Sequence, residues 1–568
     1  MRPYIVVLAQ CFLMAIVIHT MHPVRAQENQ RNNNKFGIHL AQPQDEDLDR
    51  ASELVNSTGG EWGYITLVIQ EDDRKLDKWQ AIFDTLRQRR LIPIIRLATA
   101  PDGGNWKRPE IDDAGKWADF LNSLHWVVKN RYIILFNEPN HGTEWGGETD
   151  PISFAKVNEE YARKLKEADG DFFVMMGGMD ASAPQSKPAY MDEGVFLREV
   201  VEEIGASDFN DLFDGLSSHS YPNPGFSGSP YSSGRGTIRT YEWELSLLSL
   251  LGIQQLPVFI TETGWNGDVL SRDQVAQNFL YAYQNVWLPD DRVVAVTPFV
   301  LNYQGEPFLK FSWVMLGNGG EHPEFTMVKE MEKKRGNPEI IQKGSFDLLN
   351  LPHEIVEQST YHLQIPITNN GQAIWSREFG YDFMLENVKP SQYLISSFGD
   401  IKPFETKTID IYFSTLDTLG SFHTRLVLYH HDDQIIDSSY WDYEVVLLPS
   451  LIFKVSLFPK QSSDGSKFEL QIFNKHEELV FRKDGLQVSD GQGSIEKVDN
   501  IALGKKYRVV LLKKHYLPRQ IYTQFHKDTN EVVFERMIPL DFDGDGALRW
   551  GDIPALFKNL KLIQMWMI

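Results

Sequence analysis

Eight short apolar runs, each followed by an amphipathic stretch, occupy residues 36–335 and restrict the fold more than any other feature of the chain. The runs lie at 36–40, 64–69, 92–97, 132–138, 172–179, 215–221, 257–265 and 293–303. Runs that are apolar on both faces are typical of parallel strands covered by helices. In the second amphipathic stretch Trp79, Ile82, Phe83 and Leu86 recur at helical spacing. The pattern predicts an α/β fold, a (β/α)8 TIM barrel over 33–338.

An open, doubly wound sheet is the alternative to the barrel. Such sheets usually carry a glycine-rich phosphate loop after a strand, and neither a G-x-G-x-x-G motif nor a P-loop follows any of the runs. The barrel is therefore favoured.

The pattern changes near 335–338, after which apolar residues recur at every second position. Ile409, Ile411 and Phe413 alternate in this way, which is typical of half-buried strands. We expect two β-sandwich-type domains, an immunoglobulin-like one over 345–449 and a second all-β domain over 451–540.

The first 26 residues have the pattern of a signal peptide. A basic residue precedes the apolar run 5–18, and Ala26 offers a small residue before a cleavage point. An uncleaved membrane anchor is the alternative, because the run is nearly long enough to span a bilayer. The only cysteine, Cys11, lies here, so a mature chain starting near Gln27 has no thiol chemistry. We expect an extracytoplasmic protein, secreted or associated with the cell surface.

The net charge of −22 argues against nucleic acid or an anionic membrane as a partner. It is compatible with a neutral substrate such as an oligo- or polysaccharide. A solvated acidic surface is the simpler explanation of the charge.

Two of the eight runs end at a glutamate. The segment F-N-E-P-N places Glu138 at the end of the fourth run, and I-T-E-T-G-W places Glu262 at the end of the seventh. Regular alternation puts Phe136 on the same side as Glu138, and Ile260 on the same side as Glu262. Strand ends of a barrel converge on one mouth, so the two carboxyl groups are expected to face each other. Such a pair cleaves glycosidic bonds without a cofactor. Two structural carboxylates that cap helices are the alternative.

On these motifs residues 36–335 resemble the clan A glycoside hydrolases, retaining enzymes built on a (β/α)8 barrel. The resemblance implies that Glu138 is the acid/base and Glu262 the nucleophile. It also implies that Asn137 hydrogen-bonds the 2-hydroxyl of the sugar. Together these roles imply cleavage of O-glycosidic bonds by double displacement.

Three further polar residues lie near predicted strand ends. The resemblance implies that Tyr221 holds the nucleophile and that His219 contacts the sugar or the acid/base. Arg96 ends the third run and is expected to brace a carboxylate. Each of the three also has a structural alternative, as a hydrogen-bond or ion-pair partner without a role in catalysis.

Aromatic residues are frequent in the predicted loops, at Trp62, Trp106, Trp145, Trp265, Tyr303 and Trp313. Sugar rings pack on aromatic faces, although most tryptophans in a barrel fill its core. We expect Trp265 to line the site, because it follows the nucleophile closely. Tyr303 and Trp313 are alternatives for an aromatic floor after the eighth strand.

The segment 541–552, D-F-D-G-D-G-A-L-R-W-G-D, has the spacing of a calcium-binding loop. The expected ligands are Asp541, Asp543, Asp545 and Asp552 through carboxylates and Ala547 through its carbonyl group. With the helix-like stretch that follows, 541–568 resembles half of a dockerin module, which implies a cohesin-like or cell-surface partner. Dockerins carry two such loops and only one is present here, so a calcium site that merely stabilises the terminal domain is the alternative.

These features predict an exported, retaining glycoside hydrolase. A non-catalytic glycan-binding or adhesion protein on a barrel scaffold is one alternative, and a transglycosylase is another. The sequence does not identify the sugar.

Overall fold

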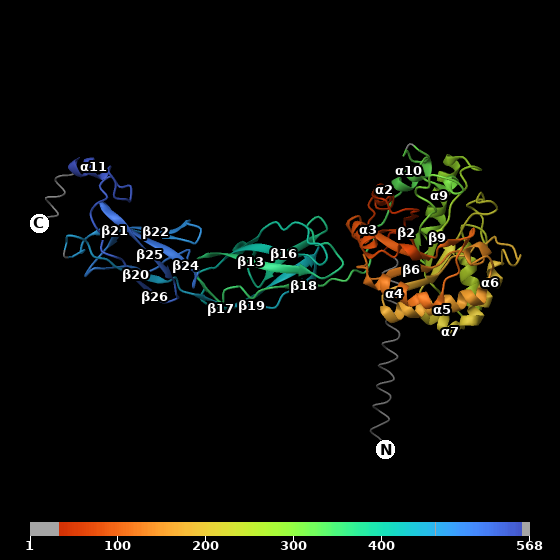
Figure 1. Cartoon of the computed structure of the whole chain (residues 1–568), viewed down its shortest axis with the longest axis horizontal. Coiled ribbons are helices and arrows are strands. Elements are labelled where there is room, and N and C mark those ends of the chain that lie inside the picture. The colour runs from red at the N-terminus through yellow and green to blue at the C-terminus, as the bar shows by residue number, and fades with distance from the viewer. Residues whose placement is uncertain (1–32, 318, 461, 559–568) are drawn as a thin grey trace, which may run out of the picture. The chain divides into compact units, whose positions relative to one another are not determined.

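The computed structural model describes residues 33–317, 319–460 and 462–558, and the chain divides into two compact units between Ile341 and Gln342 (Figure 1). The predicted signal peptide lies outside the described residues, as does the end of the predicted C-terminal helix. None of the described helices combines the length and the apolar character that crossing a membrane requires.

The first unit is built on eight parallel strands, and each predicted run overlaps one of them. They are β1 (Gly37–His39), β2 (Gly63–Gln70), β3 (Leu91–Ala98), β6 (Arg131–Leu135), β7 (Phe172–Met176), β8 (Leu216–His219), β9 (Val258–Glu262) and β10 (Val293–Val296). Strands β1, β2, β3, β6 and β7 pair in chain order in one sheet, and β8, β9 and β10 pair in another. A parallel bridge between Phe36 and Val296 joins the outer edges of the two sheets. Asp214 N donates to Val174 O at 2.9 Å between β7 and β8, which closes the (β/α)8 barrel.

Helices surround this barrel (Figure 1). They are α2 (Asp45–Val55), α3 (Leu76–Gln88), α4 (Ala114–Ser123), α5 (Pro151–Ala168), α6 (Glu193–Ile204), α7 (Ala206–Leu212), α8 (Thr240–Leu250), α9 (Arg272–Ala282) and α10 (Pro323–Glu330). Helix α3 buries Trp79, Phe83 and Leu86, as its spacing predicts, whereas Ile82 is only partly buried against the same core. The start of α9 is fixed by a capping box between Ser271 and Gln274, which satisfies backbone groups that the first helical turn leaves free.

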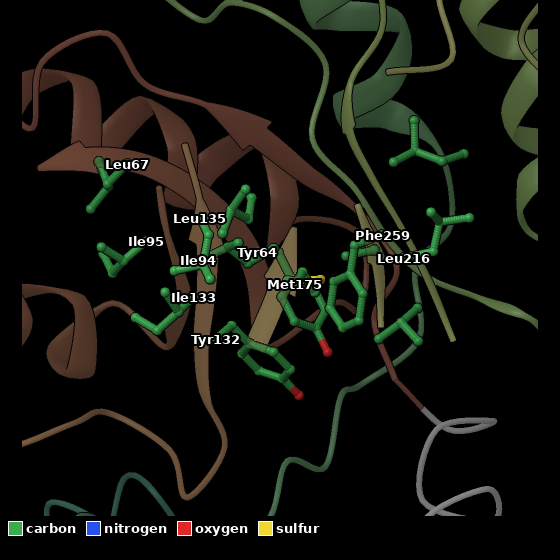
Figure 2. Packing of buried hydrophobic residues seen from close by; sticks show 14 of the residues in the cluster. Tyr64, Leu67, Ile94, Ile95, Tyr132, Ile133, Leu135, Met175, Leu216 and Phe259 are labelled. Atoms are coloured by element: carbon green, nitrogen blue, oxygen red, sulfur yellow. The ribbon is translucent and has the colours of Figure 1, made fainter. Parts of the chain in front are cut away.

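Aromatic rings fill the interior of the barrel. Tyr64, Tyr132 and Phe259 come from three different strands, and their ring centroids lie 5.2 to 6.4 Å apart (Figure 2). Phe173 packs on two of these rings. The rings identify Phe259 as a residue that faces into the barrel, which fixes the orientation of its neighbours on β9.

The second unit contains two pairs of mainly antiparallel sheets. The first pair comprises β11 (Gly344–Phe346), β13 (Thr360–Asn369), β16 (Thr406–Ser414) and β15 (Tyr393–Ile395), and β12 (Glu354–Val356), β19 (Trp441–Val446), β17 (Gly420–His430), β14 (Tyr381–Glu386) and β18 (Asp433–Asp437). The second pair comprises β23 (Gln492–Ile495), β20 (Ser450–Lys454) and β26 (Thr529–Val533), and β22 (Leu479–Gln487), β21 (Lys467–Phe473), β24 (Lys506–Lys513) and β25 (Tyr516–Gln524). The alternating residues Ile409, Ile411 and Phe413 are buried. The segment 541–552 then leads into α11 (Asp552–Lys558).

Candidate active site

Glu138 lies at the barrel mouth, three residues beyond the end of the strand that precedes it. Strand β6 ends at Leu135, and the backbone then adopts positive φ angles of 69° at Phe136 and 28° at Glu138. The ring of Phe136 packs against Trp145 and Tyr161, the latter on helix α5, and both Phe136 and Glu138 are among the residues that line the pocket at the mouth. The left-handed backbone at these two residues interrupts the regular alternation that the sequence pattern predicts.

Glu262 reaches the same mouth by a different irregularity. Phe259 faces into the barrel, so Ile260 faces outward and regular alternation would also turn Glu262 outward. The pairing of β9 with β8 shifts at this point, since Ser218 pairs with Ile260 whereas His219 pairs with Glu262. One extra residue on β9 thus turns Glu262 inward, as a β-bulge does. Ile260 and Glu262 lie on opposite sides, which corrects the second predicted alternation.

Three side chains hold the two glutamates close together. Arg96 Nη1 donates to Glu262 Oε1 at 2.6 Å, and the Tyr221 hydroxyl donates to Glu262 Oε2 at 3.1 Å. His219 Nδ1 lies 2.9 Å from Glu138 Oε1 and 3.8 Å from Glu262 Oε2. One carboxylate oxygen of each glutamate and this histidine nitrogen all lie within 4.8 Å of one another. These predicted polar residues therefore form one contiguous site.

A glycine makes room for the histidine. A Cβ on Gly178 would lie 2.3 Å from His219 Cδ2, and the Gly178 carbonyl group accepts a hydrogen bond from Glu138 N at 3.0 Å. The loop after β7 therefore fixes both the acid/base candidate and its histidine partner.

The surroundings of Glu262 keep its carboxylate ionised. Burial raises the pKa of this group, whereas the charges of His219 and Arg96 lower it. Together with His39 and the hydrogen bond from Tyr221, they lower the pKa to about 2. Burial lowers the pKa of His219, whereas the carboxylates of Glu262 and Glu138 raise it above its ordinary value. Glu262 is thus a carboxylate at neutral pH, which suits a nucleophile.

Asn137 connects the pair to a third glutamate. Its Oδ1 accepts from Arg96 Nη1 at 2.5 Å, and its Nδ2 donates to Glu144 Oε2 at 3.3 Å. Burial and the nearby charge of Glu138 raise the pKa of Glu144 to about 7. Sequence reasoning missed Glu144, because it lies in the loop after β6 and not at a strand end. Its place six residues after Glu138, in the same loop, is the sequence feature that could have indicated a role in the site.

The pair opens into a pocket of about 280 Å³ at the carboxyl ends of the strands. Its lining residues are Val68, Arg96, Leu97, Ala98, Thr99, Trp106, Lys107, Pro109, Phe136, Asn137, Glu138, His141, Glu144, Asp180, Tyr221, Phe226, Glu262, Phe299, Phe308 and Phe311. A pocket with few convergent polar groups and perturbed pKa values is the expected form of an active site.

Two predicted aromatic residues do not reach this pocket. Trp265 and Trp313 are each 1% exposed, and both pack on Phe279 of α9. Trp265 Nε1 donates to Gly228 O at 2.9 Å, so the indole is satisfied within the protein. They are core residues here, which corrects the expectation that they stack on sugar.

Other rings line the site. Tyr303 packs on Phe308 and is not itself among the lining residues. Trp106, one of the loop tryptophans noted in the sequence, does line the pocket. Four further lining residues, Phe226, Phe299, Phe308 and Phe311, were not predicted from the sequence. Phe299 follows β10 and could have been found from its place at the end of the eighth run.

The predicted calcium loop brings three of its aspartates together. Carboxylate oxygens of Asp541, Asp543 and Asp552 lie within 4.8 Å of one another. Asp545 is exposed; its Oδ1 accepts from Ala547 N at 2.9 Å, and its Oδ2 lies 3.6 Å from Arg549 Nε.

No protein-family model matches this sequence, and no curated protein matches it. Among solved structures, a glucosidase from Croceicoccus marinus aligns with 85% of this chain and 94% of its own, at 10% identity and a TM-score of 0.40. A β-mannanase from Thermomonospora fusca aligns with 53% of this chain and 92% of its own, at 13% identity and a TM-score of 0.36. An endo-β-1,4-glucanase from Xanthomonas axonopodis pv. citri aligns with 52% and 97%, at 13% identity and a TM-score of 0.35. What the site can do therefore follows from its own geometry.

Proposed function

We propose that the chain is a glycoside hydrolase that cleaves O-glycosidic bonds by double displacement, with retention at the anomeric carbon. The observation that carries the proposal is the approach of Glu138 and Glu262 to within 4.8 Å in an open pocket. Carboxyl groups this close leave no room for an intervening water, which is the arrangement of retaining enzymes, whereas inverting enzymes keep them farther apart.

The contacts of the two glutamates support different roles. Glu262 is ionised and held at both oxygens, so it attacks the anomeric carbon. Glu138 protonates the leaving oxygen as the C1–O bond breaks, and a glycosyl ester forms on Glu262. Glu138 then takes a proton from the attacking water, and the ester bond breaks to release the sugar and the Glu262 carboxylate. Asn137, held by Arg96 and Glu144, is placed to hydrogen-bond the 2-hydroxyl group.

The test is Glu262→Ala, assayed on a panel of aryl glycosides and polysaccharides. We expect hydrolysis to be lost and azide to restore turnover of activated aryl glycosides, giving a glycosyl azide of inverted configuration. Asp268→Ala is the matched control, since Asp268 is exposed in the loop after β9 and is not among the pocket residues. Unchanged hydrolysis by Glu262→Ala would contradict the proposal, and sugar binding without any turnover by the wild type would favour a binding protein.

We extend the proposal to export, on the sequence of residues 1–26 alone. N-terminal sequencing of the secreted chain should find a start near Gln27. A chain that keeps Met1 and stays with the membrane fraction would indicate an anchor instead.

Calcium binding by the C-terminal loop is part of the proposal. The convergence of Asp541, Asp543 and Asp552 supports it, because hard carboxylate oxygens are what calcium prefers. The ion would stabilise the loop and present the exposed Trp550 and Phe557 to a protein partner such as a cohesin-like domain. Calorimetric titration of the full chain with calcium should show binding that Asp541→Ala removes and Asp528→Ala, a substitution outside the loop, retains. Equal binding by both variants would contradict the assignment.

A further inference from the structure

The pocket has two unlike walls on either side of Glu262. On one side, Arg96 and Asn137 present polar groups next to Glu262 Oε1. On the other side, Tyr221 contacts Oε2 and is followed by a continuous aromatic wall. We define this aromatic wall as Phe226, Phe299, Phe308 and Phe311.

The aromatic wall is closely packed, beginning at Tyr221. The ring centroid of Phe226 lies 5.0 Å from that of Tyr221 and 5.2 Å from that of Phe311. Phe299 lies 6.1 Å from Phe311 and 5.2 Å from Phe308. The four residues come from the loops after β8 and β10, so two separate segments build one apolar surface.

This wall offers a sugar little to hydrogen-bond. Phenyl side chains have no donor or acceptor, and the Tyr221 hydroxyl already donates to Glu262. The carbonyl group of Phe226 accepts from Asn266 N at 2.8 Å, and that of Phe311 accepts from Val300 N at 3.3 Å. The wall is therefore apolar in its side chains and largely satisfied in its backbone.

The position of the nucleophile decides which part of the sugar meets this wall. This step rests on the proposed function, which places C1 over Glu262 and its ring neighbours C2 and O5 on either side. The 2-hydroxyl group requires a polar partner, and that partner is found on the side of Arg96 and Asn137. O5 and C5 then lie on the side of Tyr221, and a substituent on C5 points at the phenyl rings.

A polar substituent there would lose its water without gaining a partner. A hydroxymethyl group would bury its O6 against phenyl rings, and a carboxylate would be worse, because desolvating a charge costs more. A hydrogen or a methyl group, in contrast, gains from burial against the rings. We propose that the substrates are pyranosides whose C5 carries hydrogen or methyl, namely pentopyranosides and 6-deoxyhexopyranosides, and that hexosides and uronides are disfavoured.

The test compares 4-nitrophenyl glycosides that differ only at C5. The pairs are β-D-xylopyranoside with β-D-glucopyranoside, α-L-arabinopyranoside with β-D-galactopyranoside, and β-D-fucopyranoside with β-D-galactopyranoside. In each pair that the enzyme hydrolyses, we expect kcat/KM to be at least about tenfold higher for the first member than for the second. Equal or higher values for the glucoside or galactoside would overturn the inference.

A gain of polarity in the aromatic wall should weaken the preference. Phe226 has a φ of 56°, a conformation that asparagine tolerates well, so Phe226→Asn adds a donor without straining the loop. This variant should lower the ratio of pentoside to hexoside activity at least threefold. Tyr231→Asn, in the same loop but 72% exposed, should leave the ratio unchanged. An unchanged ratio in Phe226→Asn, with the wild-type unfolding temperature, would count against the aromatic wall as its cause.

A binding measurement tests the inference without turnover. Calorimetry with 1-deoxynojirimycin and with its analogue lacking the hydroxymethyl group should give about tenfold tighter binding of the analogue. Tighter binding of 1-deoxynojirimycin, or binding of neither, would overturn the inference. If Glu262→Ala abolishes turnover while hexosides are preferred, only this inference fails. If Glu262→Ala remains active, the proposed function itself fails.

Discussion

The ends of β6 and β9 each bring a glutamate to the pocket, but they hold it differently. Glu262 is 10% exposed in its side chain and is bound at both oxygens by Arg96 and Tyr221. Glu138 is 20% exposed and has one side-chain partner at hydrogen-bonding distance, His219 at 2.9 Å. The comparison teaches that the clamped carboxylate suits a nucleophile, which must stay ionised and fixed. The freer one suits an acid/base, which must exchange its proton with the substrate and water.

Glu138→Ala tests the difference between the two glutamates and has the largest expected effect on activity. We expect kcat/KM to fall by about 10²- to 10⁴-fold for glycosides with poor leaving groups, because no proton is supplied. Dinitrophenyl glycosides, whose leaving group needs no proton, should form the glycosyl-enzyme almost normally. Azide should then give a glycosyl azide of retained configuration, opposite to the product of Glu262→Ala. A loss that is independent of the leaving group would contradict the assignment of the acid/base.

Arg96→Leu removes the charge that holds Glu262 Oε1 and Asn137. We expect a loss of about a hundredfold in kcat/KM, the scale of a charge-assisted hydrogen bond. The pKa of Glu262 should rise from about 2, so the acid limb of the pH–rate profile moves to higher pH. Arg96→Lys keeps the positive charge and should shift the limb less. An acid limb at the same pH in wild type and Arg96→Leu would show that Arg96 does not set this pKa.

Tyr221→Phe removes one neutral hydrogen bond from Glu262 Oε2 and keeps the ring contacts with Phe226 and Phe311. We expect about a tenfold loss in kcat, with a smaller change of the acid limb than in Arg96→Leu. Kinetics over the same pH range measure both effects. A larger shift of the acid limb than in Arg96→Leu would show that Tyr221, and not Arg96, has the greater effect on the pKa of Glu262.

Glu144→Gln has the smallest expected effect and concerns stability. Burial and Glu138 raise the pKa of Glu144 to about 7, so the folded state binds this proton more tightly than the unfolded state does. Stability from this group is full below its unfolded pKa of about 4.3 and is lost as pH rises through the folded pKa. Glutamine still accepts from Asn137 but does not ionise. The variant should gain on the order of 1 kcal/mol over the wild type between pH 5 and pH 8, measured by urea unfolding. A difference that does not change with pH would contradict the raised pKa.

The sequence predicts the regular parts of the barrel well. Apolar runs and helical spacing depend on local composition, so all eight strands and the burial of Trp79 and Phe83 follow from them. The approach of Glu138 and Glu262 also follows, because strand ends converge in any such barrel.

The irregular parts could not be predicted. Positive φ at Phe136 and the shifted pairing before Glu262 both interrupt the regular alternation that a sequence pattern assumes. Despite these two irregularities, both Glu138 and Glu262 line the pocket, as predicted. Burial of Trp265 under α9 and the aromatic wall depend on how long loops fold over the barrel, which residue types do not reveal.

The stereochemistry of the first product tests the central claim most directly. Proton NMR, recorded while the wild type acts on a glycoside that it hydrolyses, identifies the anomer that is released before mutarotation. Carboxylates within 4.8 Å predict that this anomer has the configuration of the substrate. An initial product of inverted configuration would contradict the account, because a water would then have to stand between Glu138 and Glu262.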